Sequence, residues 1–446
     1  MSMIDEAVQL LQELVRNTCV NPPGNEMKSI RSIASYLELH DIEHDVFVTA
    51  SERGNLFAEI QGTGEGPSLM LGPGHVDVVP VEDESKWKIP PFSGEKKDGF
   101  IWGRGTVDML FMVVGQVVAF THLHKEKFQP KGDLKLLIVA DEEAAGQYGA
   151  KWMVENYPEK VKVDYLISEM GGFRMGENHF LYQYGEKGGT WLRLTATGTE
   201  QHGSMPYKAD NAVEKIANAI LRLTEYKAPV DTTYVRHLVE NLPIGIAQKK
   251  LISNRLTVNK AIDVLSNTDL EQAKLIHALT RMTISPNLTS GGTKVNVVPG
   301  EAYIDIDVRS LPGQDREYIL KTVREALGDL AQDIEIGPVP EQAGSEPSYG
   351  NASDIDTPLV DTMREVLKEL VGEESCLVPL LSPGVTDCRF FRQKWNSQAY
   401  GFSLFDDKLS MGEVMAMIHG PNERISIGSL ELTVKGYRRI VEKFLS

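Results

Sequence analysis

Three apolar segments of the chain end in polar residues, and helical patterns separate these segments from one another. The segments are residues 68–71, which lead to His75, residues 134–140, which lead to Asp141, and residues 163–168, which lead to Glu169. Mostly apolar strands that alternate with helices predict an α/β fold whose sheet is covered on both faces. Such sheets place their ligand sites at the carboxyl ends of the strands, so the polar residues there are candidate site residues.

A different pattern occupies the middle of the chain. Its elements are a half-exposed strand at 190–197, a helix at 209–224, strands at 283–288 and 294–309, a helix at 315–327 and a strand at 333–336. This order predicts a compact α+β unit, which residues 227–280 enlarge. We therefore expect a first domain formed by residues 1–185 and 346–446, with residues 186–345 inserted into it as a second domain.

Charge and cysteine content exclude several classes of protein. The 446 residues include 46 basic and 63 acidic side chains, a net charge of −17 that argues against nucleic acid and anionic membranes as partners. The longest apolar run, 109–120, is shorter than the ~20 residues of a membrane span and predicts a buried helix. Three scattered cysteines and an N-terminus without a basic signal region favour a cytoplasmic protein.

Taken singly, the polar residues at the strand ends have two interpretations. His75 with Asp77 could be a metal ligand with its orienting carboxylate, or an ordinary loop pair. Adjacent carboxylates such as Glu142 and Glu143 repel each other unless a cation or solvent relieves them. One could bind a metal while the other takes a proton from metal-bound water, although solvated surface pairs are commoner.

Three further residues also have two interpretations when each is considered alone. Asp108 follows a glycine-rich turn and could be a ligand or the N-cap of the next helix. Glu169 and His419 could be metal ligands or simple turn residues.

Considered together, seven segments resemble, in the same order, the M20 family of zinc aminoacyl peptidases and amidohydrolases. The segments are Gly74–Asp77 (GHVD), Gly103–Met109 (GRGTVDM), Asp141–Glu143 (DEE), Ser168–Gly172 (SEMGG), His202–Pro206 (HGSMP), Asn296–Pro299 (NVVP) and His419–Glu423 (HGPNE). The resemblance covers nearly the whole chain. It implies a mixed-sheet zinc-peptidase catalytic domain with an inserted, ferredoxin-like α+β lid that also forms a homodimer.

The resemblance also implies a ligand set for two divalent ions, zinc in the first place and manganese or cobalt as alternatives. His75 and Glu169 would hold one ion, Glu143 and His419 the other, and Asp108 would bridge them. Asp77 would orient His75, and Glu142 would be the general base. The family often has a cis peptide after the bridging aspartate, here Asp108–Met109. The next residues, Leu110 and Phe111, replace the family's lysine and glycine, so the following helix is expected to start differently.

Four further residues match family positions that contact substrate. His202 would stabilise the oxyanion in a neighbouring subunit, although by itself it is a surface histidine at a strand end. Asn296 and Arg309 would contact substrate from the lid; arginine can grip a carboxylate with two hydrogen bonds, but Arg309 could also form a strand-surface ion pair. Gly384 would belong to a loop of the first domain near the substrate.

These residues predict a hydrolase that cleaves a peptide or amide bond of a small substrate by a zinc-activated water. The substrate would be a dipeptide or a C-terminal peptide bond. The alternative is an N-acyl-amino-acid deacylase of the deacetylase or desuccinylase type. A remote alternative is a metal-binding homologue without turnover, which is disfavoured because Glu142, Asp77 and His202 are all present.

Overall fold

The computed structural model describes residues 2–340 and 347–446, and its contacts divide the chain into two units. Unit 1 comprises Met1–Tyr184, Ala352–Leu380 and Thr386–Ser446, and unit 2 comprises Gly185–Asn351 and Leu381–Val385. The expected boundary at residues 345 and 346 lies outside the described residues. The short segment Leu381–Val385, which was expected in the first domain, groups with unit 2, where Ser382 accepts a hydrogen bond from the backbone of Lys187 at 2.9 Å.

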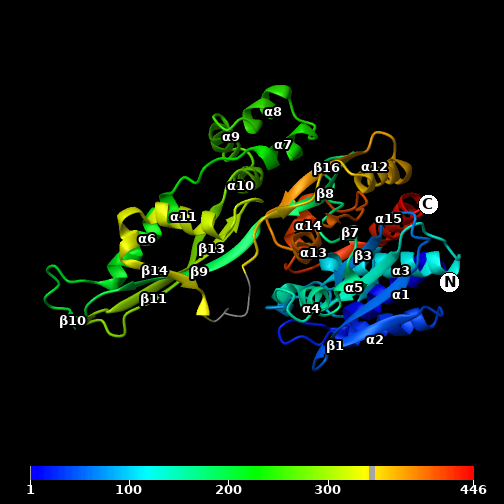
Figure 1. The fold of residues 1–446 in the computed structure, drawn as a ribbon, viewed down its shortest axis with the longest axis horizontal. Helices are drawn as coiled ribbons and strands as arrows, with labels where there is room; N and C mark the ends of the chain where they lie inside the picture. Colours follow the sequence, from blue (N-terminus) through cyan, green and yellow to red (C-terminus); the bar gives the residue numbers. More distant parts are fainter. Residues whose placement is uncertain (1, 341–346) are drawn as a thin grey trace. The chain divides into compact units, whose positions relative to one another are not determined.

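Unit 1 is built on a mixed nine-stranded sheet (Figure 1). Along the sheet the strands are β1 (His44–Ala50), β2 (Arg53–Ile60), β6 (Leu134–Val139), β3 (Leu69–His75), β7 (Tyr165–Ser168), β17 (Gln398–Gly401), β8 (His179–Glu186) and β15 (Asn351–Ala352), and β16 (Cys376–Ser382) also pairs with β8. Strands β6, β3, β7 and β17 run parallel, and β1, β2 and β8 are antiparallel to their neighbours. The parallel strands bring the ends of β3, β6 and β7 to one edge.

Helices cover both faces of this sheet. Their bounds are α1 (Met3–Asn17), α2 (Met27–Glu38), α3 (Phe111–Lys125), α4 (Ala150–Asn156), α5 (Pro158–Val161), α12 (Pro358–Val371), α13 (Cys388–Trp395), α14 (Met411–Met417) and α15 (Ile427–Phe444). One face forms a core with α4 and α13, and α3 packs on the other. Gly115 lets α3 approach α15 closely, because an added Cβ would lie 3.1 Å from Thr433 and Tyr437.

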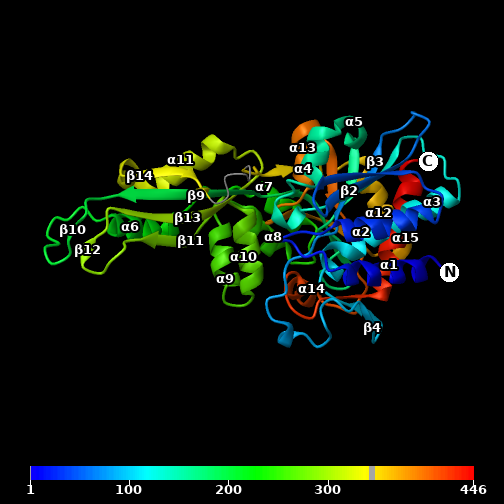
Figure 2. The ribbon, with the colours of Figure 1, turned by 90° about the horizontal axis from the view of Figure 1, so that it is seen from below.

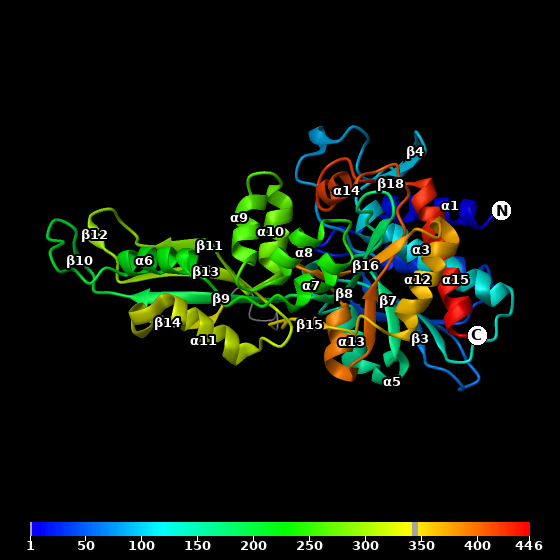
Figure 3. The ribbon, with the colours of Figure 1, turned by 90° about the horizontal axis from the view of Figure 1, so that it is seen from above.

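The expected buried helix is confirmed as α3. A helical span from Thr106 to Lys125 is long and apolar enough to cross a membrane, but 89% of its most apolar window is buried inside the protein. It therefore has the character of a core helix. A small sheet of β18 (Arg424–Ser426), β5 (Phe100–Trp102) and β4 (Glu95–Lys97) joins the segment before α3 to the segment after α14. Figures 2 and 3 both show β4 and α14 on the same side of unit 1.

Unit 2 contains a four-stranded antiparallel sheet in the order β11 (Thr283–Gly291), β13 (Glu301–Ser310), β9 (Gly188–Thr197) and β14 (Ile334–Pro338). Helices α6 (Ala212–Glu225) and α11 (Arg316–Leu327) pack on one face of it and close a common apolar core (Figure 1). This chain order and strand order are those of a ferredoxin-like unit. The predicted α/β fold with an α+β insert is confirmed.

Two additions enlarge unit 2. The region 227–280 forms α7 (Thr233–Glu240), α8 (Ile246–Ser253), α9 (Val258–Leu265) and α10 (Leu270–Leu279), a group of helices visible in Figure 3. Beyond the end of β9, the short strands β10 (Gln201–His202) and β12 (Val297–Val298) form a two-stranded ribbon.

Candidate metal centre

The carboxylate of Asp108 lies between two imidazoles. His75 ends β3, and its Nε2 is 3.4 Å from Asp108 Oδ1; His419 follows α14, and its Nε2 is 3.3 Å from Asp108 Oδ2. Asp108 itself lies in the segment Thr106–Leu110 that precedes α3, at a kink where the backbone of Asp108 and Met109 is not helical. The Asp108–Met109 peptide is cis, as the resemblance led us to expect.

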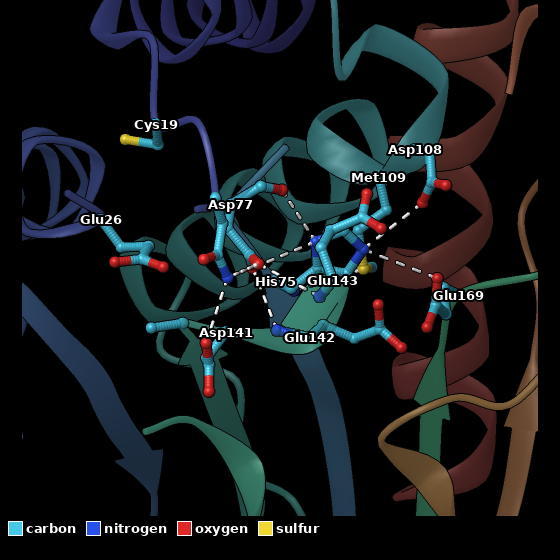
Figure 4. Close-up of polar contacts among 12 residues, drawn as sticks. Cys19, Glu26, His75, Asp77, Asp108, Met109, Asp141, Glu142, Glu143 and Glu169 are labelled. Atoms are coloured by element: carbon cyan, nitrogen blue, oxygen red, sulfur yellow. Dashed lines mark hydrogen bonds and ion pairs between the residues drawn. The ribbon is translucent and has the colours of Figure 1, made fainter. Parts of the chain in front are cut away.

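Each imidazole also faces a glutamate. Glu169 Oε2, at the end of β7, is 3.6 Å from His75 Nε2, and Glu143 Oε2, in the turn after β6, is 3.2 Å from His419 Nε2. The result is two ligand groups that share Asp108, and Figure 4 shows His75, Glu143 and Glu169 in this region. The structure brings together all five residues that the sequence predicted as metal ligands.

Glu142 lies beside these groups. Ligand atoms of His75, Glu142 and Glu169 all lie within 4.8 Å of one another. Burial, together with the charge of Glu169, raises the pKa of Glu142 well above its usual range. A carboxylate with a raised pKa next to candidate metal ligands has the properties of a proton acceptor.

The buried carboxylates of the centre repel one another, which favours a bound cation. Burial and the neighbouring Asp108 raise the pKa of Glu143 to about 7, since the two carboxylates repel each other. Burial alone would lower the pKa of His75, but the carboxylates of Asp108, Asp77 and Glu169 raise it well above its usual value. His75 Nε2 is buried and has no hydrogen-bond partner among the described residues. Nitrogen and carboxylate donors in this arrangement fit divalent metal ions.

Asp77 holds both the histidine and the neighbouring turn. Its backbone carbonyl lies 3.0 Å from His75 Nδ1, whereas its carboxylate is 3.5 Å from the same atom. The carboxylate accepts the backbone N–H groups of Glu142 at 3.2 Å and Glu143 at 3.1 Å. Asp77 is therefore placed both to orient His75 and to fix the backbone that carries the two glutamates.

Glu423 is a site residue to which sequence analysis assigned no role. Its buried carboxylate accepts the backbone N–H groups of Gly105 at 2.8 Å, Val107 at 2.7 Å and Asp108 at 3.1 Å, and it pairs with Arg104 at 2.8 Å. Glu423 thereby holds the turn that presents Asp108. A signal was present, because Glu423 ends the His419 segment, but its partners lie more than 300 residues earlier in the chain.

Asp387 is a second residue without a predicted role. Its carboxylate is buried, and neither oxygen has a hydrogen-bond partner in the described part of the chain. A Cβ added to Gly146, just after the turn with Glu142, would lie 2.7 Å from Asp387 Oδ1. Burial raises the pKa of Asp387 to about 7, and the charge of Glu169 adds to this effect. Asp387 adds a further acidic group to this part of unit 1.

The remaining predicted site residues belong to unit 2. His202 in β10 is exposed and pairs with Val297 of β12, and Gly203 donates a backbone hydrogen bond to Asn296 at 2.8 Å. The structure thus places His202 beside Asn296 across 94 residues of sequence.

Arg309 and Gly384 lie elsewhere in unit 2. Arg309 lies on β13 and forms an ion pair with Asp307 at 2.9 Å, which was the alternative interpretation of this arginine. Gly384 donates its N–H to Ser382 Oγ at 3.1 Å within the segment Leu381–Val385.

Two candidate ligand groups that share one aspartate, with a further glutamate beside them, fit the chemistry of a metal-dependent hydrolase. Residues 73–443 match the sequence model of Peptidase family M20/M25/M40. The chain therefore belongs to this family of hydrolases and is an enzyme.

Curated relatives align with most of the chain. A probable succinyl-diaminopimelate desuccinylase of Staphylococcus aureus is 27% identical over 388 residues, which cover 86% of each chain. The human N-fatty-acyl-amino acid synthase/hydrolase PM20D1 is 27% identical over 411 residues, 88% of this chain and 77% of the human protein.

Solved structures share the fold. An M20 family metallo-carboxypeptidase of Sulfolobus solfataricus superimposes with a TM-score of 0.73 at 21% identity, and the alignment covers 99% of both chains. Human carnosine dipeptidase 1 gives a TM-score of 0.62 at 16% identity and covers 99% of this chain and 96% of its own.

Proposed function

We propose that this enzyme hydrolyses the peptide or amide bond of a small substrate with two divalent metal ions, zinc in the first place. The observation that carries the proposal is the carboxylate of Asp108 between His75 and His419, with Glu142 beside the same cluster. His75 and Glu169 would hold one ion, Glu143 and His419 the other, and Asp108 both. Manganese and cobalt accept the same donor set and are alternatives to zinc.

The proposed reaction needs no nucleophilic side chain. When bound, divalent metal ions lower the pKa of coordinated water towards ~7 and so supply the nucleophile. Glu142 would take a proton from the attacking water and deliver it to the nitrogen of the leaving amine. Asp77 would keep Glu142 in place through the hydrogen bond to its backbone, which the structure contains.

We further propose that the enzyme is a homodimer in which His202 serves the site of the partner chain. Arg309 pairs with Gly189 at the start of β9, whereas His202 follows the end of β9 at Thr197. Thr197 lies eight positions after Gly189 on this extended strand, about 26 Å at ~3.3 Å per residue. A small substrate bound by Arg309 cannot reach His202 of the same chain, which supports a division of the two roles between subunits.

Two substrate classes are supported by different relatives. A dipeptide or C-terminal peptide bond accords with the carboxypeptidase and dipeptidase that share the fold. An N-acyl amino acid accords with the desuccinylase and the N-fatty-acyl-amino acid hydrolase, which align at 27% identity. Substrates of both classes carry a free carboxylate on the same Cα as the nitrogen of the scissile amide. Arg309 could bind this carboxylate with two hydrogen bonds.

A hydrolysis screen with dipeptides, N-acetyl, N-succinyl and long-chain N-acyl amino acids, each with zinc, manganese or cobalt, tests the proposal. We expect turnover in one of these classes, and its loss in Glu142→Gln at unchanged metal content. If the wild-type protein binds two metal ions but cleaves no substrate in any class, the metal-binding homologue without turnover becomes the better description.

A further inference from the structure

The turn that carries Glu142 and Glu143 has an unfavourable backbone conformation. Asp141 and Ala145, at its two ends, adopt φ values of 72° and 79°, in the left-handed region that residues with a Cβ rarely occupy. Such a conformation persists only when the surrounding structure holds it in place. The contacts of this turn are therefore part of what positions the two glutamates.

The carboxylate of Asp141 anchors the start of the turn. Its Oδ1 accepts hydrogen bonds from Arg53 at 2.7 Å and from Asn21 at 3.1 Å, and its Oδ2 accepts the N–H of Tyr148 at 3.0 Å. The Asn21 amide also donates to Asp77 at 2.9 Å. One amide thus joins the anchor of the turn to the carboxylate that binds the N–H groups of Glu142 and Glu143. Figure 4 shows Asp77 and Asp141 beside this turn.

The Arg53 guanidinium has several partners besides Asp141. It binds Glu26 through two hydrogen bonds, Nε to Oε2 at 3.1 Å and NH2 to Oε1 at 2.5 Å, and it lies 4.8 Å from the ring centre of Tyr148. A Cβ at Gly24 would lie 2.4 Å from its Cζ, so the loop that supplies Asn21 also closes over the guanidinium. Arg53 is 7% exposed, and Glu26 is completely buried.

We propose that Arg53 is a positioning residue for the metal centre: with Glu26 and Asn21 it fixes Asp141, and thereby the backbone of Glu142 and Glu143. The proposal rests on the proposed function, because it assigns those glutamates to catalysis and metal binding. In this proposal the loop Asn21–Gly24 also helps to position the two glutamates, because it supplies Asn21 and packs against the Arg53 guanidinium. The bidentate pair fixes both the place and the direction of the guanidinium, which a point charge does not.

A purely structural interpretation is that Arg53 only joins α2 to β2 through Glu26. That interpretation predicts a loss of stability without a specific effect on the metal centre. The two interpretations differ in what happens to the turn when the protein stays folded.

The test uses two variants and a control. Removal of Arg53 alone leaves Glu26 buried without a partner for its charge, so the first variant is Arg53→Met with Glu26→Gln, which replaces this pair by neutral groups of similar size. In this variant Asp141 keeps the hydrogen bonds from Asn21 and from the N–H of Tyr148. The second variant is Arg53→Lys, which keeps the positive charge but loses the planar guanidinium that makes two hydrogen bonds to Glu26. The control is Arg31→Met, which removes an exposed arginine that pairs with Glu52 at 3.5 Å.

The readouts separate positioning from stability and from the proposed function. In the metal-free protein, amide hydrogen exchange reports the backbone N–H groups of Glu142 and Glu143, and cobalt titration reports metal affinity without any substrate. With the substrate found in the screen, kcat and KM are measured separately. We expect faster exchange in this turn, cobalt binding weaker by about tenfold, and a lower kcat with little change in KM, in both Arg53 variants but not in Arg31→Met.

The proposal is overturned if a folded Arg53 variant exchanges these amides and binds cobalt as the wild type does. If the double variant does not fold, Arg53→Lys alone decides between the two outcomes. An inactive wild-type protein would count against the proposed hydrolysis and not against this positioning role, since the exchange and cobalt measurements need no turnover.

Discussion

Asp108 Oδ1 and Oδ2 face different histidines, His75 at 3.4 Å and His419 at 3.3 Å. The two oxygens of one carboxylate therefore connect two groups of ligands, His75 with Glu169 and His419 with Glu143. Because both groups use Asp108, its loss is expected to affect both.

The first prediction concerns this bridge. Asp108→Asn should lower the metal content from two ions per chain to one or none and abolish turnover, since the amide removes the charge and one of the two oxygens. Elemental analysis after dialysis against dilute zinc measures the effect. Asp45→Asn, which changes an exposed aspartate paired with Lys160, should keep both ions. Two tightly bound ions in Asp108→Asn would refute the bridging role.

The second prediction separates the adjacent glutamates. Glu142→Gln should keep both metal ions and lose turnover by about 10²–10⁴-fold, the usual contribution of general acid–base catalysis. Glu143→Gln should instead lose one ion, because its carboxylate is 3.2 Å from His419. Metal analysis and kcat on the same preparations measure both effects. Near wild-type turnover in Glu142→Gln would show that another group accepts the proton.

The third prediction concerns pH. The carboxylates of Asp108 and Glu143 raise the pKa of His419 to about 10, so at pH 8 the His419 imidazole of the metal-free protein carries a proton. The pKa of His75 is raised as well, by Asp108, Asp77 and Glu169. Metal ions bind the neutral imidazole, so binding must release the proton of His419. Metal affinity should therefore rise with pH from 7 to about 10.

Proton release can be counted with an indicator dye in weak buffer as zinc is added at pH 8. We expect at least one proton per chain, from the His419 imidazole. His419→Ala should release about one proton fewer. Glu413→Gln, which changes an exposed residue of α14, the helix before His419, should match the wild type. Zinc binding without proton release would contradict the raised pKa values.

The fourth prediction concerns Glu423. Glu423→Gln should lower the free energy of unfolding by about 3–5 kcal/mol, because it leaves the Arg104 guanidinium buried without its counter-charge. It should also weaken metal binding, since the carboxylate holds the N–H of Asp108. Urea unfolding and cobalt titration measure the two effects. A loss of less than about 1 kcal/mol in the free energy of unfolding is typical of an exposed ion pair, and it would contradict this role of Glu423.

Sequence patterns predicted the elements of this fold better than its contacts. The helices at α1 and α3 and the strand β6 were expected from local apolar periodicity, which depends only on neighbouring residues. The ligand set came from the family resemblance, because His75 and His419 are 344 residues apart and each alone had an ordinary interpretation. Arg53 gave no local signal, and the position of Glu423 at the end of the His419 segment did not indicate its role. Their roles depend on partners that only the folded chain brings together, such as Asp141 for Arg53.

The last prediction tests the proposed dimer. His202→Ala chains and Glu142→Gln chains should each be inactive or nearly so. In a mixed dimer, one site would combine its own Glu142 with the His202 of the partner, and the other would lack both. Activity should therefore return when the two inactive proteins exchange subunits, to about half the wild-type value per mixed dimer if the sites act independently.

Two controls make this experiment decisive. Subunit exchange is followed with differently tagged chains, so that the fraction of mixed dimers is known. A single chain that carries both changes, mixed with wild-type chains, leaves one site with its own Glu142 but without His202 and the other with His202 but without Glu142, so its mixed dimers should be inactive. No recovery in the first mixture, despite confirmed exchange, would show that His202 acts within its own chain or has no part in the reaction. That result would leave without a functional meaning the ~26 Å of β9 between Gly189, which pairs with Arg309, and Thr197, the end of the strand that precedes His202.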